Sequence, residues 1–91
     1  MDSNKTFVVF YSKPNSDIFK VYHVGRIKDL AVDAYKKQLP TTPNLKFVEA
    51  DLPDSDYSFL RMEYNDKFFA EDVKEILDEL MTTYNGKEIN V

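Results

Sequence analysis

The clearest periodic pattern in the chain runs from residue 68 to residue 86. Its apolar side chains recur at steps of three and four: Phe69, Val73, Ile76, Leu77, Leu80 and Tyr84. This spacing predicts an amphipathic helix whose charged residues fill the opposite face. Asn65 and Asp66 supply capping oxygens before the helix, and Asn85 and Gly86 tolerate the left-handed backbone at which helices often end. Such a helix requires an apolar surface on which to dock.

Two strand-like segments open the chain. Residues 6–12 are rich in β-branched and aromatic side chains and are apolar on both faces. This pattern predicts a strand that is covered on both sides, or one whose outer face meets a partner. Residues 17–24 form the second predicted strand, and the turn at 13–16 makes the pair an antiparallel hairpin.

Residues 26–39 predict the first helix, which follows the break at Gly25 and ends before Pro40. Its expected inward stripe consists of Ile27, Leu30, Ala31, Ala34, Tyr35 and Leu39. This helix and the one at 68–86 are expected to share one apolar surface.

The middle of the chain predicts two further strands, at 45–52 and 57–64, joined by a turn at 53–56. Alternation along them directs five apolar side chains toward the helices: Val48, Ala50, Leu52, Leu60 and Met62. Residues 87–91 also alternate and predict a short edge strand.

The elements therefore follow the order ββαββα(β) in a single domain, residues 1–91. This order predicts an α+β fold with an antiparallel sheet of four to five strands and two helices packed on one face. From residue 17 onward the order is similar to the βαββαβ order of ferredoxin-like folds. Right-handed crossover then places strand 57–64 between strands 17–24 and 45–52, with strand 6–12 on the free side of strand 17–24.

The composition describes a globular domain, with 43% hydrophobic and 31% charged residues. The longest apolar run falls well short of the ~20 residues of a membrane-spanning helix. The N-terminus has neither a basic leader nor a small-residue cleavage site. The chain also contains no cysteine. We therefore expect a cytoplasmic protein that does not bind a membrane.

Residues with catalytic chemistry are scarce. His23 is the only histidine, and its apolar strand favours a structural role over that of a base or ligand. Gly25 and Gly86 lie too far apart for a phosphate-binding loop. We therefore expect neither enzymatic activity nor a cofactor. A small enzyme or metal-binding domain without a recognisable motif is the alternative.

One acidic cluster comprises Asp51, Asp54 and Asp56, which a tight turn between strands could bring together around a cation. The segment lacks both the glycine and the bidentate glutamate of a calcium loop. Aspartate is also common in turns that bind no metal. We therefore predict no metal site here.

The aromatic residues, six tyrosines and seven phenylalanines, suggest a binding surface. If both helices cover one face of the sheet, its outer face carries Lys20, Tyr22, Phe47, Tyr57, Phe59 and Arg61. Such a surface predicts a protein interface, which a second copy of the chain could also use. Single-stranded nucleic acid stacking on the aromatic rings is the alternative, although the net charge of −4 opposes it. The other reading is that loops or the terminal segment cover these side chains.

Charge is distributed unevenly along the chain. Residues 1–48 contain eight basic and four acidic side chains, whereas residues 49–91 contain four basic and twelve acidic ones. The outer face of the helix at 68–86 is expected to present Glu71, Asp72, Glu75, Asp78 and Glu79. These features predict a protein-binding module, regulatory or inhibitory, whose partner has a basic surface. A solvated surface that serves only solubility is the simpler reading.

Overall fold

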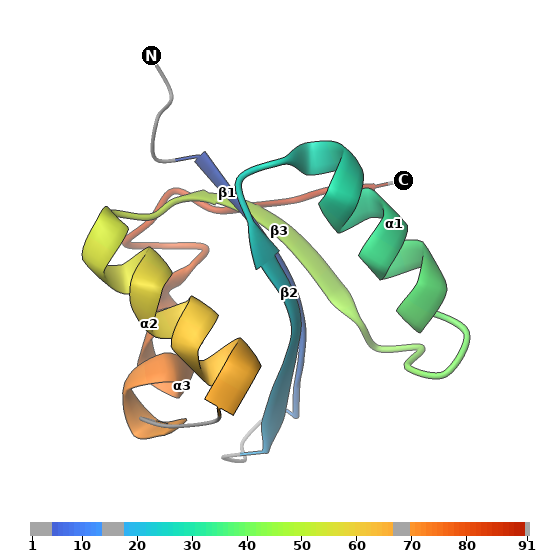
Figure 1. Cartoon of the computed structure of the whole chain (residues 1–91), viewed down its shortest axis with the longest axis horizontal. Coiled ribbons are helices and arrows are strands. Elements are labelled where there is room, and N and C mark those ends of the chain that lie inside the picture. Colours follow the sequence, from blue (N-terminus) through green and yellow to red (C-terminus); the bar gives the residue numbers. More distant parts are fainter. Residues whose placement is uncertain (1–4, 14–17, 67–69, 91) are drawn as a thin grey trace.

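The computed structural model of the chain describes residues 5–13, 18–66 and 70–90; for Phe59, 62–66 and 70–73 it describes the backbone only. A four-stranded antiparallel sheet with helices on both faces makes up the fold (Figure 1). In chain order the elements are β1 (Lys5–Ser12), β2 (Phe19–Gly25), α1 (Lys28–Gln38), β3 (Lys46–Asp51), α2 (Asp54–Asp66), α3 (Ala70–Glu79) and β4 (Lys87–Glu88).

The sheet has the strand order β2-β1-β3-β4, and every neighbouring pair is antiparallel. β1 lies inside the sheet, and residues 6–10 are all buried. This placement explains why β1 is apolar on both faces, and it confirms that the strand is covered on both sides. The hairpin of β1 and β2 is also confirmed, with Ser12 opposite Phe19.

One face of the sheet is covered by α1. Phe7 and Val9 of β1 and Phe47 of β3 point to this side, where they form a buried cluster with Ala31 of α1. Tyr35 and other half-buried side chains of α1 pack against the cluster. The expected inward stripe of this helix is correct only in part, because Ile27 and Leu30 are 59% and 57% exposed.

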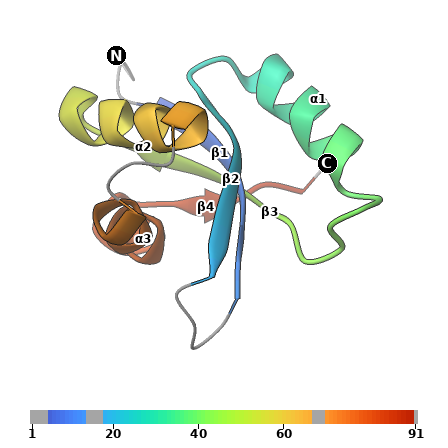
Figure 2. The ribbon, with the colours of Figure 1, turned by 60° about the horizontal axis from the view of Figure 1, so that its bottom comes forward.

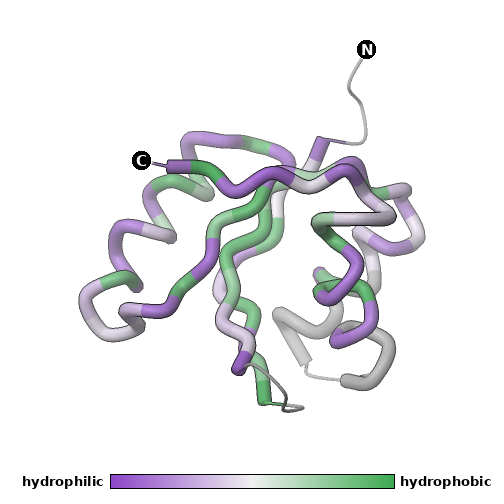
Figure 3. Tube along the Cα trace, turned by 180° about the vertical axis from the view of Figure 1, so that it is seen from behind, coloured by the Kyte–Doolittle hydropathy of each residue, from purple (hydrophilic) through white to green (hydrophobic). Residues whose placement is uncertain are grey.

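The opposite face is covered by α2 and α3 (Figure 2). Val8 and Phe10 of β1 alternate with the residues under α1 and point to this side. Helices α2 and α3 contribute the buried side chains of Leu60, Ile76 and Leu77 to this larger cluster, and Leu80 joins them from the turn directly after α3. Figure 3 shows the resulting hydropathy pattern, with hydrophobic positions along the central strands and hydrophobic and hydrophilic positions in alternation along the coloured parts of the helices.

The α+β class and the four-stranded antiparallel sheet are confirmed, as are the directions of Val48, Ala50 and Leu52. Two details of the expected arrangement differ. The helices lie on both faces rather than on one, and β1 rather than segment 57–64 occupies the inside of the sheet. The first difference follows from the second, because β1 inside the sheet has two apolar faces that each need cover.

Segment 57–64, which we expected to be a strand, belongs to helix α2. Tyr57 and Leu60, three positions apart, pack against the same cluster, as they do on a helix; on a strand they would point to opposite faces. The helix begins directly after Pro53, and the amide of Tyr57 donates to the Pro53 carbonyl at 2.9 Å. Asp54 and Asp56 lie in the first turn, where their negative charge interacts favourably with the helix dipole.

The turn after α3 delivers the last strand to the sheet. Asn85 has a φ of 53°, and the amide of Gly86 donates to the Leu80 carbonyl at 2.7 Å. A Cβ atom on Gly86 would lie 2.3 Å from that carbonyl oxygen, so only glycine fits here. β4 then pairs with β3, which confirms the expected short edge strand.

The burial of α3 generates a stability prediction. Replacing Leu77 or Leu80 by Ala should lower the free energy of unfolding by about 2–5 kcal/mol, because each leaves a cavity in a packed cluster. Replacing the exposed Glu75 by Ala should change it by less than ~0.5 kcal/mol. Urea-unfolding midpoints measure all three, and near-equal losses would contradict the orientation of α3.

Candidate functional site

The open aromatic surface expected from the sequence is not formed. Phe47 is 2% exposed, and its ring centre lies 5.4 Å from that of Tyr35 on α1. Tyr22 is half-buried against the same cluster, with the ammonium group of Lys20 5.2 Å from its ring centre. The prediction that Phe47 lies on an open face is therefore wrong, because α1 rather than solvent covers this side of the sheet.

The other residues of that expected surface, Tyr57, Phe59 and Arg61, lie on α2 and not on a strand. Tyr57 is half-buried, and the guanidinium group of Arg26 lies 4.2 Å from its ring centre. Arg61 is exposed and donates from Nη1 to the carbonyl oxygen of Val24 at 2.7 Å. The side chain of Phe59 lies outside the described residues. Tyr57 and Arg61 therefore do not form a common surface with Phe47.

The acidic helix expected from the sequence is joined by a second acidic helix on the same side of the sheet. The two helices α2 and α3 cover the same side of the sheet, and together they contain nine acidic and two basic residues. Helix α1 on the other side contains two acidic and three basic residues. The uneven charge along the chain thus becomes a difference between the two sides of the molecule. We call α2 and α3 the acidic helix layer.

Tyr84 reports on the electrostatics of this layer. Its hydroxyl donates to Oδ2 of Asp56 at 2.8 Å and so joins the turn after α3 to the first turn of α2. Burial raises the pKa of Tyr84 to about 12, helped by this hydrogen bond and by the negative charges of Asp56, Glu79 and Glu75. Three carboxylates from two helices therefore act on one phenol. Asp56 and Tyr84 were not among the expected binding residues, because a helix at 54–66 was not expected.

The carboxylates on α3 differ in their surroundings. Glu75 is exposed, whereas Asp78 accepts a 2.7 Å hydrogen bond from the ammonium group of Lys74, one turn earlier. Glu79 is half-buried and accepts from the hydroxyl of Thr83 at 3.1 Å. The side chains of Glu71 and Asp72, also expected on this face, lie outside the described residues. Within the described part of α3, Glu75 is thus the carboxylate most open to a partner.

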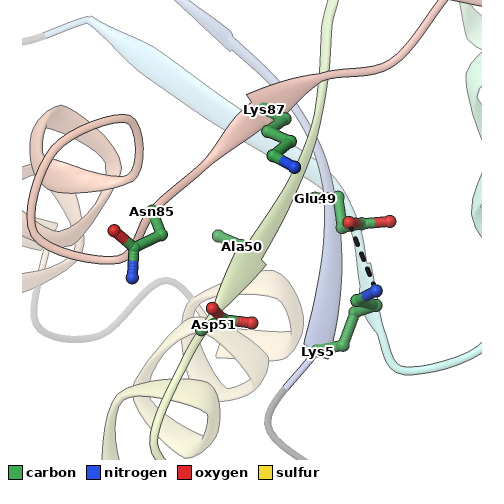
Figure 4. A pocket seen from close by; sticks show the side chains of 6 residues that line it. All are labelled: Lys5, Glu49, Ala50, Asp51, Asn85 and Lys87. Atoms are coloured by element: carbon green, nitrogen blue, oxygen red, sulfur yellow. Dashed lines mark ion pairs between the residues drawn. The ribbon is translucent and has the colours of Figure 1, made fainter. Parts of the chain in front are cut away.

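A shallow pocket lies on the other side of the sheet, at its margin. Its volume is about 310 Å³, and it is lined by Lys5, Glu49, Ala50, Asp51, Asn85 and Lys87 (Figure 4). Lys5 and Glu49 form an ion pair with an N–O distance of 3.5 Å. Pairing of β3 places Glu49 opposite Lys87 and Asp51 opposite Lys5, so positive and negative residues alternate across the strands. This arrangement stabilises a solvent-facing part of the sheet and favours no particular ligand charge.

The aspartates considered as cation ligands are separated by the fold. Asp54 lies 3.0 Å from a guanidinium nitrogen of Arg26, and Asp56 accepts the hydrogen bond from Tyr84. Asp51 lines the pocket described above. Across residues 5–13, 18–66 and 70–90, no three carboxylates or histidines are grouped to hold a metal ion.

His23 is half-buried beside a β-bulge in β2. One step along β1, from Val9 to Phe10, corresponds to two steps along β2, from His23 to Val21, so Tyr22 is the extra residue. Nε2 of His23 is buried, and a Cβ atom on Gly25 would lie 2.9 Å from it. Burial lowers the pKa of His23 below its usual 6.5, and the charge of Arg61 lowers it further. The ring is therefore neutral near pH 7.

Comparisons with protein-family models, with curated proteins and with solved structures give no match for this chain. In the portion of the chain that the structure describes, no helix has the length and apolar character needed to cross a membrane.

The lowered pKa of His23 predicts the direction of a pH effect on stability. Between the folded and unfolded pKa values the unfolded chain binds more protons, so the free energy of unfolding falls as pH decreases through this interval. The stabilisation that depends on a neutral His23 ring is fully present above the pKa of histidine in the unfolded chain, which is about 6.5. Urea unfolding at about pH 7.5, 6.5 and 5.5 should show a smaller decrease for His23→Gln than for the wild type. The carboxylates are common to both proteins, so equal decreases would contradict this role of His23.

Proposed function

We propose that the protein is a non-catalytic, regulatory or inhibitory binding module whose acidic helix layer docks on a basic surface of another protein. The observation that carries this proposal is the presence of nine acidic and two basic residues on two helices that cover the same face of the sheet. A surface of one dominant sign attracts an oppositely charged partner and accelerates its association.

The raised pKa of Tyr84 supports the proposal, because negative charges from Asp56, Glu79 and Glu75 contribute to it. Exposed carboxylates act over about 8 Å at physiological ionic strength, so a cluster from two helices acts on a partner at close approach. The interaction should therefore weaken as salt increases.

The alternative of single-stranded nucleic acid depends on stacked aromatic rings on an open sheet. Phe47 is buried beneath α1, and Tyr57 packs against the core from α2. The acidic helix layer also repels phosphate groups. Protein binding is therefore the function that we favour.

Reversing charge on the acidic layer should weaken partner binding. The double variant Glu75→Lys with Glu79→Lys changes two carboxylates one helical turn apart. The matched control, Asp29→Lys with Asp33→Lys, makes the same change in charge on the exposed side of α1. The wild type and the two double variants are each used as bait for affinity capture from host lysate at about 50 and 150 mM salt.

A basic protein should be recovered with the wild type and with the α1 control, and lost with the α3 variant. When the recovered protein is used as the binding partner, its association rate with the α3 variant should be about tenfold lower than with the wild type, and the dissociation rate should change less. Equal recovery with both variants would contradict docking through the acidic helix layer.

Nucleic acid binding gives a second, independent test. We expect no binding of short single- or double-stranded oligonucleotides at about 0.15 M salt, because the acidic layer repels phosphates. Fluorescence anisotropy measures this directly. Micromolar binding that is lost in Tyr22→Ala would instead support a stacking surface.

A further inference from the structure

We propose that the outer edge of β2 is a second binding site, at which an extended, acidic segment of a partner protein adds to the sheet as a further strand. This surface is distinct from the acidic helix layer, and the partner chemistry is the opposite. The proposal rests on the open edge, on the charges around it and on features that disfavour pairing between two copies of β2.

The two edges of the sheet differ in how they are covered. The edge at β3 is closed along much of its length. There β4 pairs with Val48 and Glu49, the amide of Asp51 donates to the Tyr84 carbonyl at 2.8 Å, and the amide of Ile89 donates to the Phe47 carbonyl at 2.9 Å.

β2 forms the opposite edge and is seven residues long. Among the residues that the structure describes, no strand pairs with its outer side. Figure 2 shows this strand at the sheet margin, with α1 on one side and α2 and α3 on the other. An extended peptide can hydrogen-bond to such an edge through its own backbone.

One carbonyl of this strand already has a partner from outside the sheet. The guanidinium group of Arg61 reaches from α2 to the carbonyl oxygen of Val24 at 2.7 Å and remains exposed to solvent. Lys20 is exposed near the other end of β2. Between Ile18 and Lys28 the sequence has basic residues and no acidic one. Lys20 and Arg61 thus place two cations along this edge, whereas Arg26 is paired with Asp54.

The spacing of these cations indicates the kind of segment that fits. Lys20 and Val24 are four positions apart on β2. The bulge lies between them, and they pair with Tyr11 and Val8 of β1, so they are only three positions apart on a regular partner strand, or about 10 Å at ~3.3 Å per residue.

Lys20 lies over the ring of Tyr22 on the α1 side of the sheet, whereas Arg61 reaches Val24 from α2 on the opposite side. Two carboxylates three positions apart on an added strand span this distance and point to opposite faces. Backbone hydrogen bonds would supply the pairing, and the two carboxylates would favour acidic over basic segments.

Two features of β2 disfavour pairing with a second copy. The exposed Lys20 places positive charge on the edge, and the bulge at Tyr22 interrupts the regular ladder. A second copy of β2 would bring the same lysine and the same bulge, so both features disfavour pairing between two copies. An acidic segment gains from Lys20 and does not bring a second bulge to the edge.

The test uses the whole protein and a capped seven-residue peptide of alternating valine and threonine, with glutamate at its first and fourth positions. A control peptide carries lysine at those two positions. Amide hydrogen exchange should slow at residues 19–23 when the acidic peptide is added. The lysine peptide should bind about tenfold more weakly, because it places cations beside Lys20 and Arg61.

Two charge-reversal variants test whether the acidic peptide binds at β2. Lys20→Glu should weaken binding of the acidic peptide by about fivefold, whereas Lys46→Glu, an exposed lysine on β3, should change it by less than about twofold. Circular dichroism checks that both variants are folded.

Equal affinity for the two peptides, protection away from β2, or no binding at about 1 mM peptide would overturn the proposal. Protection of residues 19–23 that rises with protein concentration, without peptide, would assign the edge to a second copy and also overturn it. Failure of this test leaves docking through the acidic helix layer unaffected, because the carboxylates of that layer are not part of the proposed site at β2.

Discussion

Burial of β1 on both faces is the constraint on which the rest of the structure depends. Phe7 and Val9 point to one side of the sheet, Val8 and Phe10 point to the other, and all four are at most 5% exposed. Burying such a side chain contributes about 1.5–3 kcal/mol, and a whole domain is stable by only about 5–15 kcal/mol. Leaving either face of β1 open would therefore remove a large part of the stability.

The position of the helices follows from this constraint. β2 and β3 lie on either side of β1, so the chain between them passes over one face, and α1 covers that face. The remaining helices, α2 and α3, then cover the opposite face. Since acidic residues are concentrated in the second half of the chain, this division also separates charge between the two sides of the molecule. The acidic helix layer is thus a consequence of how the core is covered.

Two arginines connect this layer to the edge of the sheet. Arg26, which follows β2, contacts Asp54 and the ring of Tyr57 at the start of α2. Arg61, farther along α2, binds the carbonyl of Val24. These contacts hold α2 beside the end of β2, and they place positive charge where the acidic layer meets the open edge. The two proposed binding surfaces therefore adjoin each other while differing in charge.

Much of the local structure could be predicted from the sequence. The three- and four-residue spacing of Ile76, Leu77 and Leu80 places them on one face of a helix, and all three are buried. The two apolar faces of residues 6–12 indicated a strand covered on both sides. The sequence also predicted that Glu75 and Asp78 lie on the outer face of this helix, and both are exposed. These features depend on side chains close together in the sequence, so their periodicity is sufficient.

Tertiary contacts decided the rest. Over residues 57–64 the apolar pattern fits both a strand and a helix, and the choice depends on whether Tyr57 and Leu60 must reach the same cluster. The interior place of β1 depends on pairing with β3, about forty residues away along the chain. That pairing put α1 over Phe47 and removed the aromatic surface, whereas α2 brought Asp56 to Tyr84. Periodicity determines which side chains share a face of an element, but the burial of that face is decided by contacts between elements distant in the sequence.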